Sequence, residues 1–200
     1  MYNIGQEIYA CGETPYFYEI SPTLETLERN HTLKAYGQLA VSSHFQKDQK
    51  TGDIYTMGTA TTMSASMKYN VLKMTADCMN KKLDKRFEVV CSIPSRWRTC
   101  TTYLHSFGMT ENYLIFIEQP MVLHNLKVAA IKLKGYCLND CAEWLQDEKN
   151  KFCIVNKKSG KVVQREIYAE QPFFFMHFSN CFEQDGHVSN KSKTLMLVFN

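Results

Sequence analysis

The stretch TYLHSFGMTENYLIFIEQP, residues 102–120, decides the fold of this chain. Its run 113–117 is short, apolar and rich in β-branched and aromatic residues, which predicts a buried β-strand. His105 precedes Gly108, where we expect a tight turn that leads into this strand. A histidine held beside a turn and a rigid strand has little freedom, as a metal ligand requires. A lone histidine in such a place is nevertheless more often an ordinary core or surface group.

Many other short strands, separated by turn residues, are expected along the chain. They cover residues 7–10, 16–20, 39–43, 54–59, 69–74, 87–93, 151–155, 161–168 and 173–178. Only residues 123–133 and 138–147 place apolar side chains near helical spacing. The first of these segments could pack in the core, cover a sheet edge or touch a membrane surface. This pattern predicts an all-β architecture and does not choose among a sandwich, a barrel and a propeller.

Composition excludes several classes of protein. The formal net charge of +3 comes from dispersed basic residues, and the densest stretches, 80–86 and 157–161, are expected to be solvated turns, so we expect no nucleic-acid partner. No apolar run reaches about 18 residues, so we expect no transmembrane segment, and the N-terminal residues lead us to expect no secretory signal. A cytoplasmic protein is therefore expected, in which the eight cysteines are free thiols.

Three of the six histidines share a context. His44 ends a strand before a polar turn, His105 precedes the 113–117 strand, and His177 lies in an aromatic strand. Because they are roughly 60–70 residues apart, they can meet only if each lies at the same end of a different sheet, as a radial all-β fold allows. Imidazole suits iron, copper and zinc alike, so the spacing does not choose the metal. The others, which we expect at the surface, are His31, His124 and His187.

Several strings resemble the carotenoid cleavage oxygenase family. They are VVCSIPSRW at 89–97 followed by YLHSFGMTENYLIFIEQP at 103–120, SSHFQKD at 42–48 with GDIYTMGT at 52–59, KSGKVV at 158–163, FFFMHFSNCFEQDGHV at 173–188, and SPTLETL at 21–27. The resemblance covers roughly residues 4–188. It implies a seven-bladed β-propeller with Fe(II) on its axis, and an oxygenase that uses O₂ to cleave a double bond of a carotenoid or apocarotenoid into aldehydes such as retinal.

The resemblance also implies a set of site residues. The family holds its iron on four histidines, and His44, His105 and His177 match the first three. It implies that Glu13 is an outer-shell group that accepts a hydrogen bond from the ligand matching His105, which orients an imidazole and raises its basicity. By the residues alone, Glu13 would be a solvated turn residue. No catalytic side chain beyond the metal site is implied, and Phe173–Phe175 could line an apolar tunnel or pack between blades.

Length sets the expected extent of the propeller. At about 40–50 residues a blade, 200 residues correspond to about four blades and an incomplete ring. We expect residues 1–188 to be this partial propeller and residues 189–200 a divergent C-terminal tail, with no counterpart of the fourth histidine. Two alternatives stay open, namely a retinoid isomerohydrolase of the same family and an inactive fragment that binds an apolar ligand or a partner chain. Peripheral contact with a membrane, for uptake of the substrate, is a further expectation.

Overall fold

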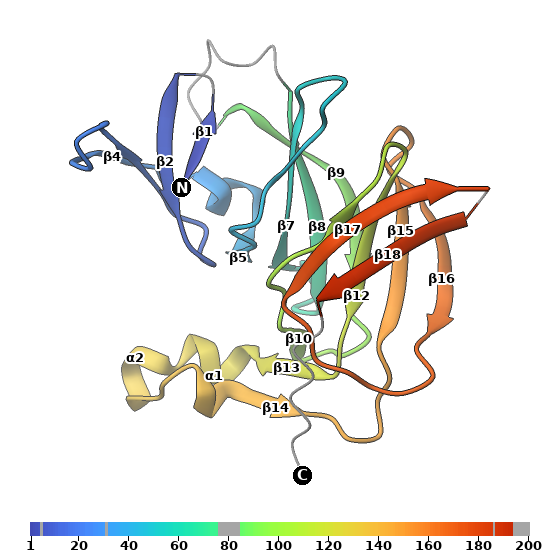
Figure 1. Cartoon of the computed structure of the whole chain (residues 1–200). Helices are drawn as coiled ribbons and strands as arrows, with labels where there is room; N and C mark the ends of the chain where they lie inside the picture. The colour runs from blue at the N-terminus through green and yellow to red at the C-terminus, as the bar shows by residue number, and fades with distance from the viewer. Residues whose placement is uncertain (5, 31, 76–84, 186, 194–200) are drawn as a thin grey trace. The chain divides into compact units, whose positions relative to one another are not determined.

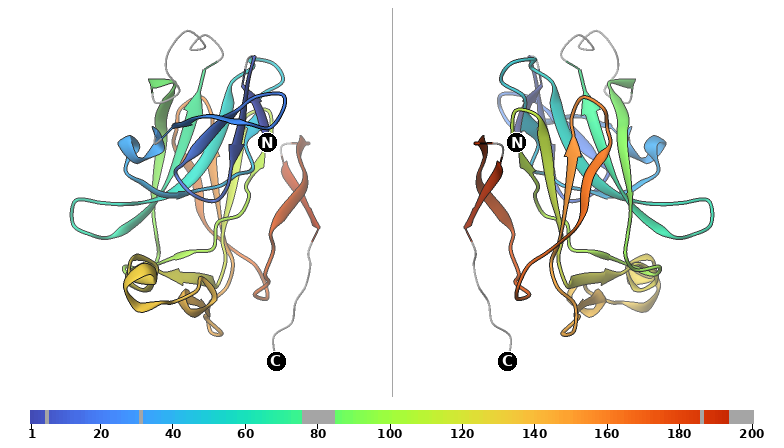
Figure 2. Two further views of the ribbon diagram at one scale, coloured as in Figure 1. Left: turned by 90° about the vertical axis from the view of Figure 1, so that its left-hand side faces the viewer. Right: turned by 90° about the vertical axis from the view of Figure 1, so that its right-hand side faces the viewer.

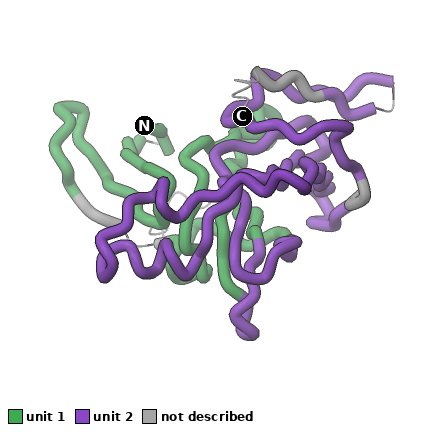
Figure 3. Tube along the Cα trace, turned by 90° about the horizontal axis from the view of Figure 1, so that it is seen from below, with its two compact units in different colours: residues 1–61, 69–92 green, residues 62–68, 93–200 purple. Residues whose placement is uncertain are grey.

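The computed structural model describes residues 1–4, 6–30, 32–75, 85–185 and 187–193 (Figure 1). The chain divides into two compact units, one of residues 1–61 with 69–92 and the other of residues 62–68 with 93–200 (Figure 3). Most regular structure in the described ranges is β-strand, which confirms the prediction of a mainly β protein.

Two antiparallel sheets make up the first unit. One has the order β1 (Tyr2–Ile4), β2 (Glu7–Cys11), β3 (Phe17–Ile20) and β4 (Thr26–Asn30). The other has the order β5 (Gln38–Val41), β7 (Ile54–Thr61), β8 (Met67–Met74) and β9 (Phe87–Pro94), with β6 (Gln46–Lys47) beside β7. The 3₁₀ helix η1 (Thr32–Tyr36) connects them. Strands therefore pair mainly with their neighbours in sequence.

A shared core joins these two sheets. Its buried members come from both of them and include Ile4, Tyr9, Phe17, Val41, Ile54, Leu72 and Phe87. Phe45, just before β6, packs its ring against Phe17 and Tyr2 at centroid distances of 5.6 and 4.9 Å. Edge-to-face aromatic contacts of this kind stabilise a pair beyond the area they bury. The loop between β5 and β6 is thus anchored in the core.

Arg86 corrects the prediction of a solvated basic turn. Its side chain is buried, and its two terminal nitrogens donate to the Glu7 carboxylate at 2.5 and 3.1 Å. These hydrogen bonds lower the pKa of Glu7. A guanidinium can be buried when a bidentate carboxylate compensates for its lost hydration, and the partner lies 79 positions away in sequence. Residues 80–84 of that stretch lie outside the described residues.

The second unit contains three further sheets. The first has the order β10 (Cys100–Thr102), β13 (Met121–His124) and β14 (Ala142–Trp144). The second has the order β11 (Gly108–Met109), β12 (Tyr113–Glu118), β15 (Lys151–Asn156) and β16 (Val162–Tyr168). The third is the hairpin of β17 (His177–Gln184) and β18 (His187–Lys193). Figure 2 shows this hairpin as a twisted two-stranded ribbon. The short helices are α1 (Asn125–Ala129), α2 (Ile131–Lys134) and the 3₁₀ helix η4 (Asn139–Cys141).

Strand β12 is the centre of the second unit. It lies between β11 and β15, and every residue from Leu114 to Glu118 is buried. This confirms the strand predicted at 113–117. The turn predicted at Gly108 is wrong, because Gly108 pairs with Ile115 inside β11 and the chain turns at residues 110–113 instead. A Cβ at Gly108 would collide with the thiol of Cys181, so glycine is needed there for close packing.

The two helix predictions have different outcomes. Residues 123–133 do contain α1 and most of α2, but residues 138–147 do not form an α-helix. The 3₁₀ turn η4 occupies residues 139–141, and β14 then pairs with β13. Pairing with a strand about 20 positions earlier overrides the local apolar spacing, which no short sequence window can reveal. Among the described helices, none is long and apolar enough to cross a bilayer.

The aromatic strand predicted at 173–178 is wrong over most of its length. Residues 172–176 are irregular, and β17 begins only at His177. Side-chain amides take the place of a neighbouring strand here. Asn150 accepts from the N–H of Phe173 at 2.8 Å and donates to its carbonyl at 2.9 Å.

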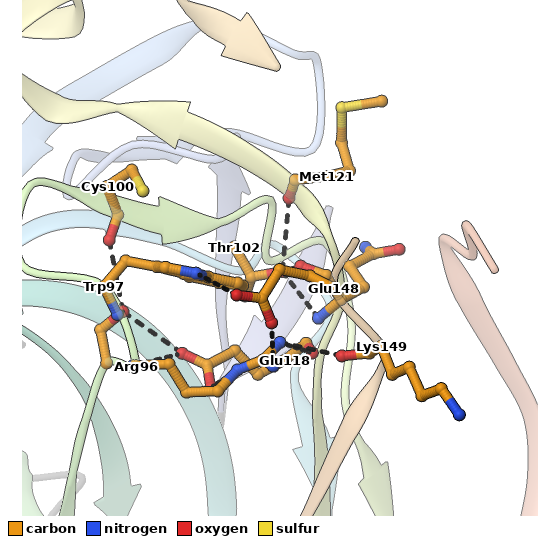
Figure 4. A network of polar contacts seen from close by, with 10 residues as sticks. Arg96, Trp97, Cys100, Thr102, Glu118, Met121, Glu148 and Lys149 are labelled. Carbon is orange, nitrogen blue, oxygen red and sulfur yellow. Dashed lines mark hydrogen bonds and ion pairs between the residues drawn. The ribbon is translucent and has the colours of Figure 1, made fainter. Parts of the chain in front are cut away.

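A buried ionic network fastens β12 to the segment that follows β9 (Figure 4). Arg96 Nε donates to Glu118 at 2.9 Å and its Nη1 donates to Glu148 at 2.9 Å. Its Nη2 donates to the carbonyl oxygens of Glu118 and Lys149 at 3.1 and 3.0 Å. The Glu118 side chain is only 3% exposed. A carboxylate buried to this extent is tolerated because the guanidinium compensates its charge.

Candidate metal centre

The segment carrying His105 is held at both ends by regular structure. Residues 103–107 run irregularly from β10 to β11, and the N–H of Tyr103 donates to the carbonyl of Met121 at 2.7 Å. Ser106 and Phe107 are buried, whereas His105 is half-buried. The Tyr103 hydroxyl lies 3.4 Å from Nδ1 of His105. This contact restricts the orientation of the imidazole.

His177 approaches His105 within the second unit. The two ring centroids are 4.6 Å apart with an interplanar angle of 83°, and one ring nitrogen of each lies within 4.8 Å of the other. His177 is exposed at the first position of β17. Neutral imidazoles each offer one lone pair, so this pair, 72 positions apart, is a donor set that could bind a metal ion. The structure brings these two predicted residues together.

His44 lies in the first unit. It sits between β5 and β6 and is half-buried, and its N–H donates to Ser42 Oγ at 3.1 Å. Ser42 is in turn tied to β7, because Thr56 Oγ1 donates to its carbonyl at 3.0 Å. The next residue, Phe45, is the core anchor described above. The backbone that carries His44 is therefore rigid, and its assignment as a ligand stays a prediction.

Glu13 and the other three histidines were also named in the sequence analysis. Glu13 is half-buried in the turn between β2 and β3 of the first unit, and its outer-shell role also stays a prediction. His124 pairs with Glu143 at 2.5 Å across β13 and β14, and His187 is exposed. His31 lies outside the described residues.

Sequence reasoning missed Tyr103. In an extended segment, residues two positions apart point to the same side, so an aromatic hydroxyl two residues before a candidate histidine is a usable signal. Tyr103 also stacks on Phe174 at a centroid distance of 6.3 Å. Both rings line an apolar pocket of about 250 Å³ together with Met121, Leu123, Leu138, Asn139 and Ala142. Phe175, by contrast, is buried and packs against Phe178.

Known proteins resemble this chain over nearly its whole length. The family model described as retinal pigment epithelial membrane protein matches residues 1–198. The carotenoid isomerooxygenase of Drosophila melanogaster is 33% identical over 189 residues, which cover 94% of this chain and 29% of that protein. The β,β-carotene 15,15'-dioxygenase of Gallus gallus is 36% identical over 189 residues, 92% of this chain and 36% of that protein. The chain thus spans about a third of the length of these relatives.

The fold has a counterpart among solved structures. The crystal structure of cobalt-substituted apocarotenoid oxygenase from Synechocystis matches with a TM-score of 0.69 at 20% identity, over 96% of this chain and 38% of that one. This chain is thus a mainly β protein with the fold of part of that oxygenase. The chain belongs to the carotenoid cleavage oxygenase family, which is a family of enzymes. The resemblance seen in the sequence is confirmed.

Proposed function

We propose that this chain carries part of the Fe(II) site of an oxygenase that cleaves a carotenoid or apocarotenoid double bond, with His44, His105 and His177 as ligands. The observation that carries the proposal is the pairing of His105 with His177. Support comes from the relatives, whose names describe carotenoid oxygenases, and from the solved neighbour described as cobalt-substituted.

The residues present fit a ferrous ion. Imidazole nitrogen is a suitable ligand for iron, and His105 and His177 place a ring nitrogen each within 4.8 Å of the other. When bound, the iron supplies the O₂ chemistry that converts one carbon–carbon double bond into two carbonyl products. His105 is oriented by the Tyr103 hydroxyl. Glu13 is proposed as the outer-shell carboxylate that accepts from the far nitrogen of an iron ligand, which would fix the tautomer of that imidazole.

The apolar pocket suits a polyene. Its lining of Tyr103, Met121, Leu123 and Phe174 offers aromatic and aliphatic contacts, which bind conjugated hydrocarbon mainly by removing it from water. Tyr103 belongs both to this pocket and to the surroundings of His105. A substrate held there would lie next to the histidine-bearing segment.

A propeller is the architecture proposed for this part of the fold. The described strands form five separate antiparallel sheets of two to five strands each, and small sheets of this size are the units of a propeller. Residues 1–188 would contribute about four blades of a seven-bladed ring, and residues 189–200 a divergent tail. Residues 194–200 of that tail lie outside the described part.

A substrate comparison tests the proposed reaction. We expect iron-reconstituted protein to convert a carotenoid to aldehydes that carry label from ¹⁸O₂, and the His105→Ala variant to form none. Products are identified by chromatography and mass spectrometry. Cleavage and isomerisation of a retinyl ester instead would favour the isomerohydrolase alternative. Absence of product from both substrates, with iron bound, would favour a chain that only binds an apolar ligand or a partner.

Peripheral membrane contact is proposed for the segment of α1 and α2. Leu126 and Leu133 are 77% and 85% exposed, and exposed lysines on the same segment are Lys127, Lys132 and Lys134. Apolar side chains that can enter the interface, flanked by cations that attract anionic headgroups, are the features of an interfacial anchor.

Replacing Leu133 with aspartate is expected to weaken binding to phosphatidylserine-containing vesicles by tenfold or more, because burial of one leucine contributes about 1.5–3 kcal/mol. Vesicle co-sedimentation measures this. Met63→Asp is the matched control, since Met63 is also a fully exposed apolar side chain but lies in the β7–β8 turn. Equal binding by the two variants would contradict the assignment of this segment.

A further inference from the structure

The segment around His105 and the segment just before His177 lack a strand ladder, although His177 itself begins β17. Residues 103–107 connect β10 to β11, and residues 172–176 precede β17, both without regular structure. Buried carbonyl and N–H groups still need partners, because each one left unpaired costs about as much as a lost hydrogen bond. In both segments, side chains of the second unit provide partners.

Gln119 provides three of these hydrogen bonds. Its Nε2 donates to the carbonyl oxygens of Tyr103 and Phe175 at 3.0 and 3.1 Å, and its Oε1 accepts from the N–H of Phe175 at 3.0 Å. The residue is 1% exposed. Paired residues in an antiparallel ladder exchange the same two bonds that Gln119 makes with Phe175. One side-chain amide thus replaces a missing strand and joins both histidine segments.

The position of Gln119 is itself rigid. It directly follows β12, and its backbone N–H donates to Thr102 Oγ1 at 3.0 Å. The same hydroxyl donates to the carbonyl of Gln119 at 2.8 Å. Thr102 is the last residue of β10, so the amide projects from a point where two strands are bonded together.

Ser106 makes a second link between the same segments. Its hydroxyl donates to the carbonyl of Met176. Ser106 follows His105 directly, and Met176 directly precedes His177. The two links therefore lie on either side of His105, at Tyr103 and Ser106, and both end just before His177, at Phe175 and Met176.

We propose that Gln119 is a positioning residue for the histidine pair, holding residues 103–107 and 172–176 at the separation at which His105 and His177 bind one metal ion. The assumption that a metal ion binds here rests on the proposed function, whereas the hydrogen bonds that link the two segments do not depend on it. Groups that orient metal ligands typically change metal affinity by about 10–100-fold when they are removed. Gln119 would act in this way through the backbone.

Asn150 offers a matched control. It is a fully buried amide that makes the same two hydrogen bonds to Phe173 that Gln119 makes to Phe175. Its side-chain bonds reach only this segment, four residues before His177. The variants to compare are therefore Gln119→Met, which keeps the shape but removes the amide, Asn150→Leu, and Ser106→Ala.

Cobalt(II) titration followed by visible absorption measures the site. Gln119→Met is expected to lower cobalt affinity by about 10–100-fold and to change the d–d spectrum. Asn150→Leu is expected to keep the cobalt affinity and the spectrum of the unmodified protein, even if its melting temperature falls as far as that of Gln119→Met. Ser106→Ala removes a single hydroxyl and is expected to fold. If Gln119→Met does not fold, Ser106→Ala carries the test, and it is expected to lower the cobalt affinity by a smaller factor.

Imidazole ¹⁵N resonances of the metal-free protein give a second readout. In Gln119→Met the His105 and His177 signals should shift or broaden while the His124 signal stays. Unchanged signals for the pair, or an equal loss of cobalt affinity in Asn150→Leu, would overturn the proposal. If the unmodified chain binds no cobalt while the pair still responds to Gln119→Met, the metal assignment fails and the positioning of the pair stands.

Discussion

Purified protein carrying His105→Ala should lose its iron. In anaerobic reconstitution we expect near-stoichiometric Fe(II) in the unmodified chain and affinity reduced by more than about 100-fold in the variant, because loss of a direct ligand exceeds the 10–100-fold cost of losing an outer-shell group. The His105 ring faces His177 at 4.6 Å, and its removal leaves one imidazole of the pair. Iron per chain, measured by metal analysis, checks this.

His124→Ala is the control for that experiment. His124 is in the same unit but pairs with Glu143 across β13 and β14, so its loss should leave the iron content unchanged. Circular dichroism should show that both variants keep their β structure. Iron retained at the same level in His105→Ala would refute the ligand assignment, and so would parallel losses in the two variants.

The second large effect is on stability. Arg96→Met is expected to destabilise the fold by about 3–5 kcal/mol, because it removes the cation that compensates the charge of the buried Glu118 carboxylate. At about 2–4 °C per kcal/mol for a chain of this size, the melting temperature should fall on the order of 10 °C. Thermal unfolding followed by circular dichroism measures the change.

Arg98→Met provides the comparison, since Arg98 is exposed two positions further along and surface substitutions usually change stability by less than about 0.5 kcal/mol. The double variant Arg96→Met with Glu118→Gln should recover part of the loss, because a neutral amide is less costly to bury than an unpaired charge. If Arg96→Met has the same melting temperature as the unmodified protein, the network of Figure 4 does not stabilise the fold.

The strands were largely predictable because their signals are local. Residues 54–59, 69–74, 87–93 and 113–117 are apolar runs bounded by polar or turn residues, and each lies within a strand of the structure. The turn expected at residues 157–161 was equally clear, and Gly160 adopts the left-handed conformation there, with φ of 66°. Consecutive residues alone decide such elements, because a short buried strand is bounded by its own turns.

The turn misplaced at Gly108 is a local error, because its partner Ile115 lies only seven positions away. The other wrong predictions share a cause in distant partners, since residues 142–144 pair with β13 and residues 173–176 are bonded by Asn150 and Gln119. Each outcome depends on hydrogen bonds that compete with the local preference and come from elsewhere in the chain. A short sequence window contains none of them.

By itself, the sequence determined the family, the mainly β architecture and the candidate histidines, with His44 and Glu13 still resting on resemblance. Only the tertiary structure placed His105 beside His177 and identified the side chains that hold them there. Gln119 follows a predicted strand and carries no local sign of a role, yet its amide bonds residues 16 and 56 positions away. Tertiary folding decides such contacts, because it alone brings residues so far apart in sequence within reach of one amide.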